Sequence, residues 1–551
     1  MAALTPKPFA HLLARALAEY EHDRSIFHLP KRSFWKPREG LDLSVVLPGG
    51  RASTPLGPAA GPHTQLAQNL VAAWLAGSRV LELKTVQVLD HLEIPRPCID
   101  APAEGYNVEW SQELTLEESA REYATAWYLI HILRARGIPG ETGAHTIFDG
   151  SVGYDLNGIR SASVARFLDT MMDTRALLAS LRDSLPSSLR AIADVPVPTR
   201  VFDTVTLSSF HGCPPDEIER IVEHLLTRHG LHVVVKLNPT LLGYDRVEQL
   251  VRGALGWEHV QLDRTAFDKD LQWDDALRML DWLSGLAARN SLSLGVKFTN
   301  TLVVKNTRGR LEGEHVYLSG PPLHVLATTL ADRFVQATGG RYAVSFSAGI
   351  TAENFPDAVA HGFAPVTTCT DLLQPTGYRR LPRYLKALES DMERVGATTL
   401  GEYVRARAGV MPSASVTEAA AANLARYAAT VASDPRYHAT AAPAPRVREP
   451  LPVFDCDSCN NCLLVCPNGA FHALDMPPTA MAAGDFQRET QWVVDGGSCN
   501  ECGNCDTHCP QDGGPWRVKP RWNPEKLLFD APAATPSQVA AIKAAWGSAK
   551  R

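Results

Sequence analysis

The 551 residues carry 54 Lys and Arg against 60 Asp and Glu, a net charge of −6, with no basic block to follow a phosphate backbone. This balance argues against nucleic acid as a partner, and no apolar run reaches the length of a membrane span. A chain of this length is expected to form two or three domains, and its cysteine usage without a signal peptide indicates the reducing cytoplasm.

The N-terminal segment, 1–41, is expected to be a helical extension. Its apolar residues recur at the spacing of one helix face, namely Phe9, Leu12, Leu13, Ala16, Leu17 and Tyr20. We therefore expect an amphipathic helix that packs on the domain that follows.

Residues 42–390 alternate short β-branched runs with longer helical patterns. Strands are expected at 80–84, 106–110, 145–148, 203–208, 232–237, 292–298, 342–347 and 365–368. Several of these runs are almost entirely apolar, as in parallel strands that are covered on both faces. One helix is well marked, because Pro214 and Pro215 open it and Gly230 ends it. The pattern predicts an α/β fold, a (β/α)8 TIM barrel, with a doubly wound open sheet as the alternative.

Polar and small residues follow several of the predicted strands, where a barrel carries its chemistry. They are Lys84-Thr85, Lys236-Leu237-Asn238, Thr299-Asn300-Thr301 and Ser347-Ala348-Gly349-Ile350, with a further small-residue turn at 57–62. Two lysines in a barrel mouth are costly without an anion, which a reduced flavin ring supplies. Backbone N–H groups at 347–350 suit a phosphate. Each lysine taken alone is also compatible with a solvated rim charge, and Glu82 or Glu109 with an ion pair to a nearby lysine.

Beyond the barrel, 391–450 is interpreted as Ala-rich helices and a Pro-rich linker, and 523–551 as a tail with one short helix. The segment between them, 451–522, contains the motif CxxCxxCxxxCP twice, with the eight cysteines Cys456, Cys459, Cys462, Cys466, Cys499, Cys502, Cys505 and Cys509. This spacing favours two cubane iron–sulfur clusters. Zinc knuckles or disulfides are the alternative, although zinc sites usually use two CxxC pairs.

The doubled motif resembles bacterial two-cluster ferredoxins, in which the fourth cysteine of each run ligates the other cluster. That resemblance implies one [4Fe-4S] cluster on Cys456, Cys459, Cys462 and Cys509. It implies a second on Cys499, Cys502, Cys505 and Cys466.

The order of the strand-end residues resembles the FMN-binding barrel of dihydroorotate dehydrogenases and of the pyrimidine-reducing half of dihydropyrimidine dehydrogenases. The resemblance implies that the isoalloxazine ring or ribityl chain contacts Lys84, Lys236, Asn300 and Thr301. It places against the ring Ala59, Ala60 and Gly61, and at the phosphate Ala348, Gly349, Cys369 and Thr370.

A broader likeness covers most of the chain. The segments PLGPAAGPHTQLAQN, ELKTVQVLD, HGCPPDEIERI and VKLNPTLLGY, with the cysteine-rich module, are similar to proteins labelled selenate reductase subunit or glutamate synthase-like. Longer members of that group carry an FAD and NAD(P)H module, and this chain has no GxGxxG segment of that kind. The resemblance implies that a separate NAD(P)H/FAD subunit like the glutamate synthase small subunit, or a ferredoxin, exchanges electrons with it.

The loop after the fourth expected strand departs from the dihydroorotate pattern, in which a cysteine transfers the proton. Ser209 stands at that place, and Cys213 and His211 follow closely as rival catalytic residues. Cys213 is favoured slightly because a thiol is tuned more easily than a hydroxyl, although it is also compatible with an inert loop cysteine. Asn107 and Asn238 are candidate substrate contacts.

These features predict an iron–sulfur flavoprotein oxidoreductase with FMN and two [4Fe-4S] clusters. Its expected substrate is a small molecule with a C=C or C–C bond next to a carbonyl, such as a purine- or pyrimidine-derived cyclic amide, although the substrate class rests on analogy. We expect an oligomer or hetero-complex. The alternative is an electron-transfer subunit of a larger reductase with no substrate chemistry of its own.

Overall fold

The computed structural model describes residues 4–89, 92–108, 111–140, 145–208, 211–439, 447 and 449–549. Its centre is a sheet of eight parallel strands: β5 (Leu56–Pro58), β6 (Val80–Glu82), β9 (Ile147–Val152), β10 (Thr204–Ser208), β11 (His232–Leu237), β12 (Leu294–Phe298), β15 (Ala343–Phe346) and β16 (Val366–Thr368). The strands neighbour one another in chain order, and the Arg79 N–H before β6 donates to the Leu56 carbonyl of β5 at 2.9 Å. The sheet therefore closes into the predicted barrel rather than an open sheet.

One predicted strand lies outside the barrel. The 106–110 prediction corresponds to β8 (Gly105–Asn107), which pairs antiparallel with β7 (Ile99–Asp100) and with β14 (His315–Ser319), and β14 pairs with β13 (Leu302–Lys305). We call these four strands the cap sheet. The prediction of a barrel strand there is wrong, and the first barrel strand is β5. Its sequence, Leu-Gly-Pro, has no alternation and contains two turn-forming residues, so it resembled a turn.

Helices follow the barrel strands in the order expected for a (β/α)8 fold. They are α2 (Ala67–Leu75), α3 (Leu116–Ala135), α4 (Leu156–Ile159), α5 (Ala162–Met172), α6 (Arg175–Asp183), α7 (Ser187–Arg190), α8 (Pro215–His229), α9 (Tyr244–Glu248), α10 (Arg264–Lys269), α11 (Trp273–Arg289), α12 (Pro321–Thr338), α13 (Phe355–Ala360) and α14 (Leu381–Arg394). Helix α8 has the predicted ends, with Pro214 as N-cap and Gly230 in the left-handed region.

The N-terminal extension packs as predicted. Helix α1 (Phe9–Ala18) buries Phe9, Leu12, Leu13 and Ala16, and the Phe9 ring stacks on Tyr128 of α3 with centroids 5.0 Å apart. The short antiparallel pairs β1 (Ser25–Ile26) with β2 (Leu29–Pro30), and β3 (Val45–Leu47) with β4 (Gly50–Ala52), precede the barrel.

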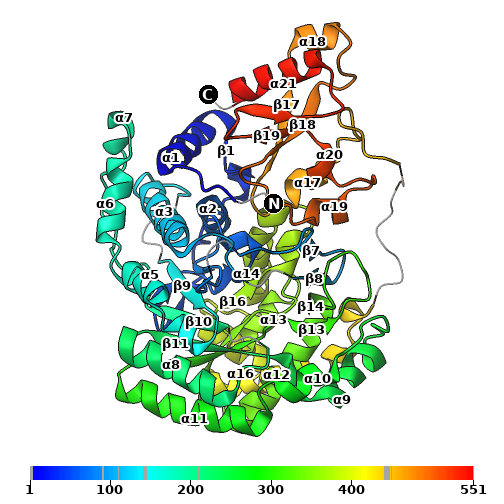
Figure 1. The fold of residues 1–551 in the computed structure, drawn as a ribbon. Helices are drawn as coiled ribbons and strands as arrows, with labels where there is room; N and C mark the ends of the chain where they lie inside the picture. The colour runs from blue at the N-terminus through cyan, green and yellow to red at the C-terminus, as the bar shows by residue number, and fades with distance from the viewer. Residues whose placement is uncertain are drawn as a thin grey trace.

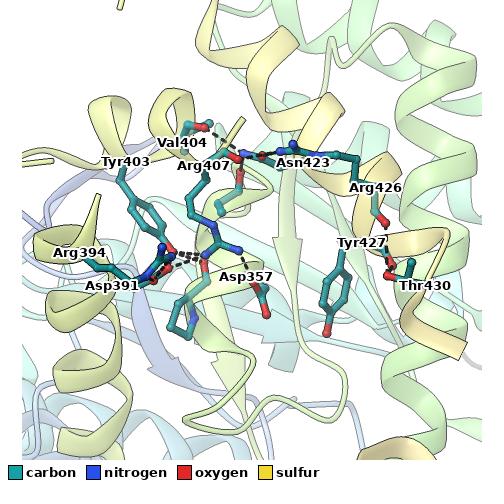
Figure 2. Close-up of polar contacts among 12 residues, drawn as sticks. Asp357, Asp391, Arg394, Tyr403, Val404, Arg407, Asn423, Arg426, Tyr427 and Thr430 are labelled. Atoms are coloured by element: carbon teal, nitrogen blue, oxygen red, sulfur yellow. Dashed lines mark hydrogen bonds and ion pairs between the residues drawn. The ribbon is translucent and has the colours of Figure 1, made fainter. Parts of the chain in front are cut away.

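After the last barrel helix come α15 (Leu400–Ala408), which contacts α13, and α16 (Val416–Ala428), which lies beside α12 (Figure 1). The Arg407 guanidinium of α15 bridges Asp357 of α13 at 2.6 Å and Asp391 of α14 at 2.5 Å, and the Tyr403 hydroxyl donates to Asp391 at 2.6 Å (Figure 2). A shared cation between two carboxylates holds these helices in place. The helices predicted in 391–450 are thereby fixed to the outer layer of the barrel.

The C-terminal module is a four-stranded sheet with short helices, at the top of Figure 1. Its strands are β17 (Phe471–Asp475), β18 (Thr490–Asp495), β19 (Arg521–Asn523) and β20 (Leu528–Asp530), and its helices are α17 (Asn461–Leu464), α18 (Pro478–Ala482), α19 (Asn504–His508), α20 (Pro515–Val518) and α21 (Pro536–Ala549). Ile542 and Trp546 of α21 are buried against Phe529 and Val493. The segment interpreted as a tail thus supplies part of the module's core.

No helix within the described residues is long and apolar enough to span a membrane.

Candidate functional site

A cavity of about 520 Å³ opens at the carboxyl ends of the barrel strands, under the cap sheet. Its walls include strand-end residues, together with Tyr106, Asn107 and Tyr317 from the cap sheet. Every residue that the flavin resemblance singled out borders it: Ala59, Ala60, Gly61, Lys84, Lys236, Asn300, Thr301, Ala348, Gly349, Cys369 and Thr370. The fold therefore brings the whole predicted set around one space.

Lys236, at the end of β11, places an ammonium group in this cavity. Burial, helped by the nearby Lys297 and Lys84, lowers the pKa of Lys236 to about 8, although Glu82 opposes the change. Among the described residues, its ammonium has no hydrogen-bond or ion-pair partner. A half-buried cation without an anion is unfavourable, so this wall of the cavity is suited to a negatively charged group.

Lys297 and Glu82 form an ion pair inside the barrel, with side chains 2% and 3% exposed. The Lys297 ammonium also donates to Ser345 Oγ at 3.2 Å and Thr367 Oγ1 at 3.1 Å. Glu82 Oε2 accepts from the Ala60 N–H at 3.1 Å, so the pair also holds the turn that borders the cavity. The ion pair expected for Glu82 is confirmed, and Glu109 lies outside the described residues. Sequence reasoning missed Lys297 as the partner of Glu82. Its position in the middle of the apolar run Leu294–Phe298 was the signal that could have revealed it.

Thr206, on strand β10, faces another buried carboxylate. Its Oγ1 donates to Asp149 Oδ2 at 2.6 Å. Burial first and the charge of Glu82 second raise the pKa of Asp149 to about 6. Thr206 therefore serves the polar interior of the barrel and does not border the cavity.

The turn Ser347–Ile350 has its carbonyl groups held by surrounding side chains. The Ala348 carbonyl is 2.9 Å from His324 Nδ1, the Gly349 carbonyl accepts from Asn354 Nδ2 at 3.0 Å, and the Ile350 carbonyl accepts from Tyr384 at 2.9 Å. Gly349 has φ +52°, and a Cβ there would meet the Gly320 carbonyl oxygen. Within the described chain, the N–H groups of Ala348, Gly349 and Ile350 donate no hydrogen bond. Such a nest of N–H groups suits a phosphate.

The candidate proton-transfer residues differ in whether they border the cavity. His211 borders the cavity, whereas Cys213 is 2% exposed and does not. Burial, followed by the charges of nearby carboxylates that begin with Glu217, raises the pKa of Cys213 to about 12. A protonated thiol behind the wall is poorly placed for proton transfer. Ser209 lies outside the described residues.

The two residues predicted to contact the substrate differ in their position relative to the cavity. Asn107 borders the cavity, but Asn238 lies behind its wall. Asn238 Nδ2 donates to Asp270 Oδ2 at 3.1 Å and is 3.3 Å from His211 Nδ1. Asn238 thus contacts a residue that sequence reasoning missed, since Asp270 stands in a loop between α10 and α11 without a motif.

The eight motif cysteines fall into two groups, and each group has members from both repeats. One group, here the distal set, comprises Cys456, Cys459, Cys462 and Cys509, which border one small cavity. The other, here the proximal set, comprises Cys466, Cys499, Cys502 and Cys505. Burial first, and neighbouring thiols after it, raise the pKa of Cys499, Cys502 and Cys505. Buried thiols need metal to become thiolates, and this donor set fits iron–sulfur clusters.

The proximal set lies against the wall of the barrel cavity. The Cys502 carbonyl accepts from the N–H groups of Cys98 at 3.0 Å and Ile99 at 2.8 Å, and Ile99 borders the cavity. Asn504 Nδ2 donates to the carbonyl of Leu373, another cavity residue, at 2.9 Å. The hydroxyl of Tyr378 donates to the Pro467 carbonyl, next to Cys466, at 3.1 Å. Continuous contacts therefore join the two sites.

The chain combines a closed (β/α)8 barrel, a cavity at its strand ends and a two-cluster module. This combination is typical of iron–sulfur oxidoreductases. Residues 27–435 match the family described as "Oxidoreductase YgfK, N-terminal TIM-barrel domain", and residues 455–512 match the "4Fe-4S dicluster domain". Because the first match covers most of the sequence, the chain belongs to this oxidoreductase family.

Curated relatives support this placement. The protein named as the oxidoreductase YgfK of Escherichia coli (strain K12) is 43% identical over 405 residues, which are 70% of this chain and 39% of that protein. The relative of the same name from Escherichia coli O157:H7 gives the same values. The chain thus spans about two fifths of the length of these relatives. A ligand-free DHODH structure from Eimeria tenella is 16% identical, with a TM-score of 0.44, over 72% of this chain and 97% of that one.

Proposed function

We propose that this chain is the FMN- and iron–sulfur-binding part of an oxidoreductase that acts on CH–CH groups. Its substrate is a small molecule with a C=C or C–C bond next to a carbonyl, in a purine- or pyrimidine-derived cyclic amide. Electrons pass singly between the barrel and an external partner through the two cluster sites. When bound, the flavin would exchange a hydride with the substrate and single electrons with the clusters.

The observation that carries this proposal is the pairing of two anion sites in one cavity. Lys236 provides an unpartnered ammonium within the described residues, and Ala348–Ile350 provide unused N–H groups. FMN has negative charge at both its reduced ring and its phosphate. Lys236 and Lys84 would face the ring, and the Gly349 turn with Thr370 the phosphate. Both sites border the same cavity of about 520 Å³.

The position of the cluster sites supports an electron path that leads outward. The proximal set touches the cavity wall through Cys98 and Ile99, and three of its cysteines are buried. The distal set includes the exposed Cys459. We infer that electrons enter or leave at the distal set, where a partner can approach.

The partner in this proposal is an NAD(P)H- and FAD-binding subunit or domain, or a ferredoxin. Support comes from the two-cluster module and from the curated relatives, which are much longer than this chain. We place the protein in the cytoplasm, since eight cluster thiolates and three further cysteines require reducing conditions.

A second function, electron transfer without substrate chemistry in the barrel, is favoured by one observation. Cys213 lies behind the cavity wall, and the Thr206 hydroxyl donates a hydrogen bond to Asp149, so neither side chain is placed to transfer a proton in the cavity. In that case the flavin would only exchange electrons.

Anaerobic flavin reduction separates the two functions. Protein loaded with FMN is mixed with cyclic amides and with purine or pyrimidine derivatives, and flavin absorbance is followed in both redox directions. Bleaching or reoxidation by one class, followed by reduction or oxidation of the clusters, is expected. If no compound in the screen changes the flavin while a one-electron reagent reduces it through the clusters, the electron-transfer function replaces the leading one.

A further inference from the structure

A carboxylate–histidine pair borders the cavity at the mouth of the barrel. His211 Nδ1 lies 3.2 Å from Asp270 Oδ2, and the Asp270 side chain is only 1% exposed. The imidazole also stacks on Tyr317 of the cap sheet, with ring centroids 5.9 Å apart and planes 17° apart. His211 and Tyr317 both border the cavity, whereas Asp270 lies behind them.

Asp270 is held by several donors besides the histidine. Its Oδ1 accepts from the Gly212 N–H at 2.5 Å, and its Oδ2 accepts from Thr240 Oγ1 at 2.8 Å and Asn238 Nδ2 at 3.1 Å. Burial opposes its charge, but hydrogen bonds from His211, Gly212 and Thr240 keep the pKa of Asp270 below its usual value. The carboxylate therefore stays ionised and fixed in orientation.

This network fixes the roles of the two imidazole nitrogens. With an ionised acceptor at Nδ1, the proton of the neutral ring resides there, and Nε2 is left with a lone pair. Nε2 is buried and makes no hydrogen bond with the described part of the chain. The contact between His211 and Asp270 is neither a surface ion pair nor part of a metal site. The Asp270 side chain is inaccessible, and its hydrogen-bond donors come from four separate residues.

We propose that His211 transfers the proton in the barrel reaction through Nε2, and that Asp270 is its positioning residue. This inference rests on the proposed function for the identity of the reaction. In the reducing direction, the substrate would gain a hydride at one carbon of its C=C bond, supplied by the flavin when it is bound. Protonated His211 breaks its Nε2–H bond and gives that proton to the carbon beside the carbonyl. The imidazole then regains a proton from water, so protons and electrons balance.

Asp270 is the carboxylate in direct contact with an imidazole nitrogen of His211. The other titratable groups in the neighbouring segments are Tyr317, Lys269, Cys213, Asp155, Asp216 and Glu217. Replacement of Asp270 should therefore alter the reactivity of His211 more than replacement of any other carboxylate.

The first test uses flavin-free protein and needs no substrate. Diethyl pyrocarbonate modifies neutral imidazole, and mass spectrometry reports the rate at which each histidine is modified at one fixed pH. In Asp270→Asn, the ring loses the carboxylate that holds Nδ1, so the modification rate of His211 should rise by a factor of about three or more. Asp263→Asn is the matched control, because Asp263 Oδ2 is 2.9 Å from His315 Nε2 in a pair that does not border the cavity.

The control should change the modification rate of His315 and leave that of His211 unchanged. A His211 rate in Asp270→Asn equal to that of the wild type would overturn the dyad.

The second test uses FMN-loaded enzyme and a substrate from the flavin screen. His211→Gln should slow hydride exchange by at least about 100-fold, and Asp270→Asn should slow it less and displace the pH profile. Asp263→Asn should match the wild type. A loss in Cys213→Ser equal to that in His211→Gln would overturn the assignment. Failure of FMN to bind would refute the proposed function, while the modification profile of His211 would still decide whether the dyad exists.

Discussion

The proximal and distal cysteine sets share one spacing and differ in their surroundings. Cys499, Cys502 and Cys505 of the proximal set are buried, whereas Cys459 of the distal set is exposed. The Cys502 carbonyl accepts two N–H groups from the segment that borders the barrel cavity, and the distal set borders its own small surface cavity. Ligand spacing thus specifies the kind of cluster, while docking on the barrel specifies its place in the electron path.

The largest expected effect comes from removing one ligand from each set. Cys502→Ala should cost about half of the iron and should abolish electron exchange between the flavin and any external carrier. Cys459→Ala should cost a similar amount of iron, but flavin and the proximal cluster should still exchange electrons. Iron content, cluster EPR and rapid anaerobic reduction measure the difference. Equal kinetics for the two variants would show that the sets do not act in sequence.

A substitution that weakens flavin binding in the cavity should leave both cysteine sets unchanged. Lys236→Met removes the unpartnered ammonium, so FMN affinity should fall about 10- to 100-fold, as expected for a charged hydrogen bond of about 1.5–3 kcal/mol. Flavin fluorescence quenching gives the affinity, and iron content should stay at the wild-type value. Lys305→Met on β13 is the control, because that lysine is exposed and outside the cavity. A tenfold loss in the control variant would contradict the specific role of Lys236.

The same lysine predicts a pH dependence of FMN binding. Because burial lowers the pKa of Lys236 to about 8, its charge is present below that pH and is lost above it. An anionic ligand prefers the protonated form, so affinity should be highest below about pH 8 and should fall as pH rises through it. Titrations of flavin-free protein across this range should show the fall in the wild type. A curve of the same shape in Lys236→Met would assign the dependence to another group.

The smallest effect concerns two asparagines at the same place in the two motifs. Asn504, between Cys502 and Cys505, donates to the carbonyls of Leu373 and Val465, while Asn461, between Cys459 and Cys462, donates to that of His508. Asn504→Ala should cost about 1–3 kcal/mol of unfolding free energy and slow electron transfer at the proximal set. Asn461→Ala should cost less and leave that transfer unchanged. Chemical denaturation and rapid reduction compare them.

Local patterns were sufficient to predict much of the fold and site. Seven of the expected strands are barrel strands, because buried parallel strands leave continuous apolar runs, and helix α8 has the ends that Pro214 and Gly230 specify. The cavity residues were predictable because a closed barrel collects the carboxyl ends of its strands on one face. The cysteine motif likewise carries its ligand spacing in the sequence.

Long-range features were not predictable from the sequence. Asp270 meets His211 across 59 positions, and nothing near Asp270 marks it as a partner. Lys297 meets Glu82 across 215 positions, and the cap sheet joins strands from two distant loops. Strand β5 is too short to show a period. The docking of Cys502 against Ile99 depends on complementary surfaces rather than on a motif.

The central claim, a flavin barrel connected to two clusters, is tested most directly by the cofactor content of anaerobically purified protein. FMN, iron and acid-labile sulfide are measured per chain, before and after FMN is offered. The account predicts about one FMN and about eight irons, with eight sulfides. About eight irons without flavin, even after FMN is supplied, would contradict it and leave two clusters on a barrel that binds no flavin.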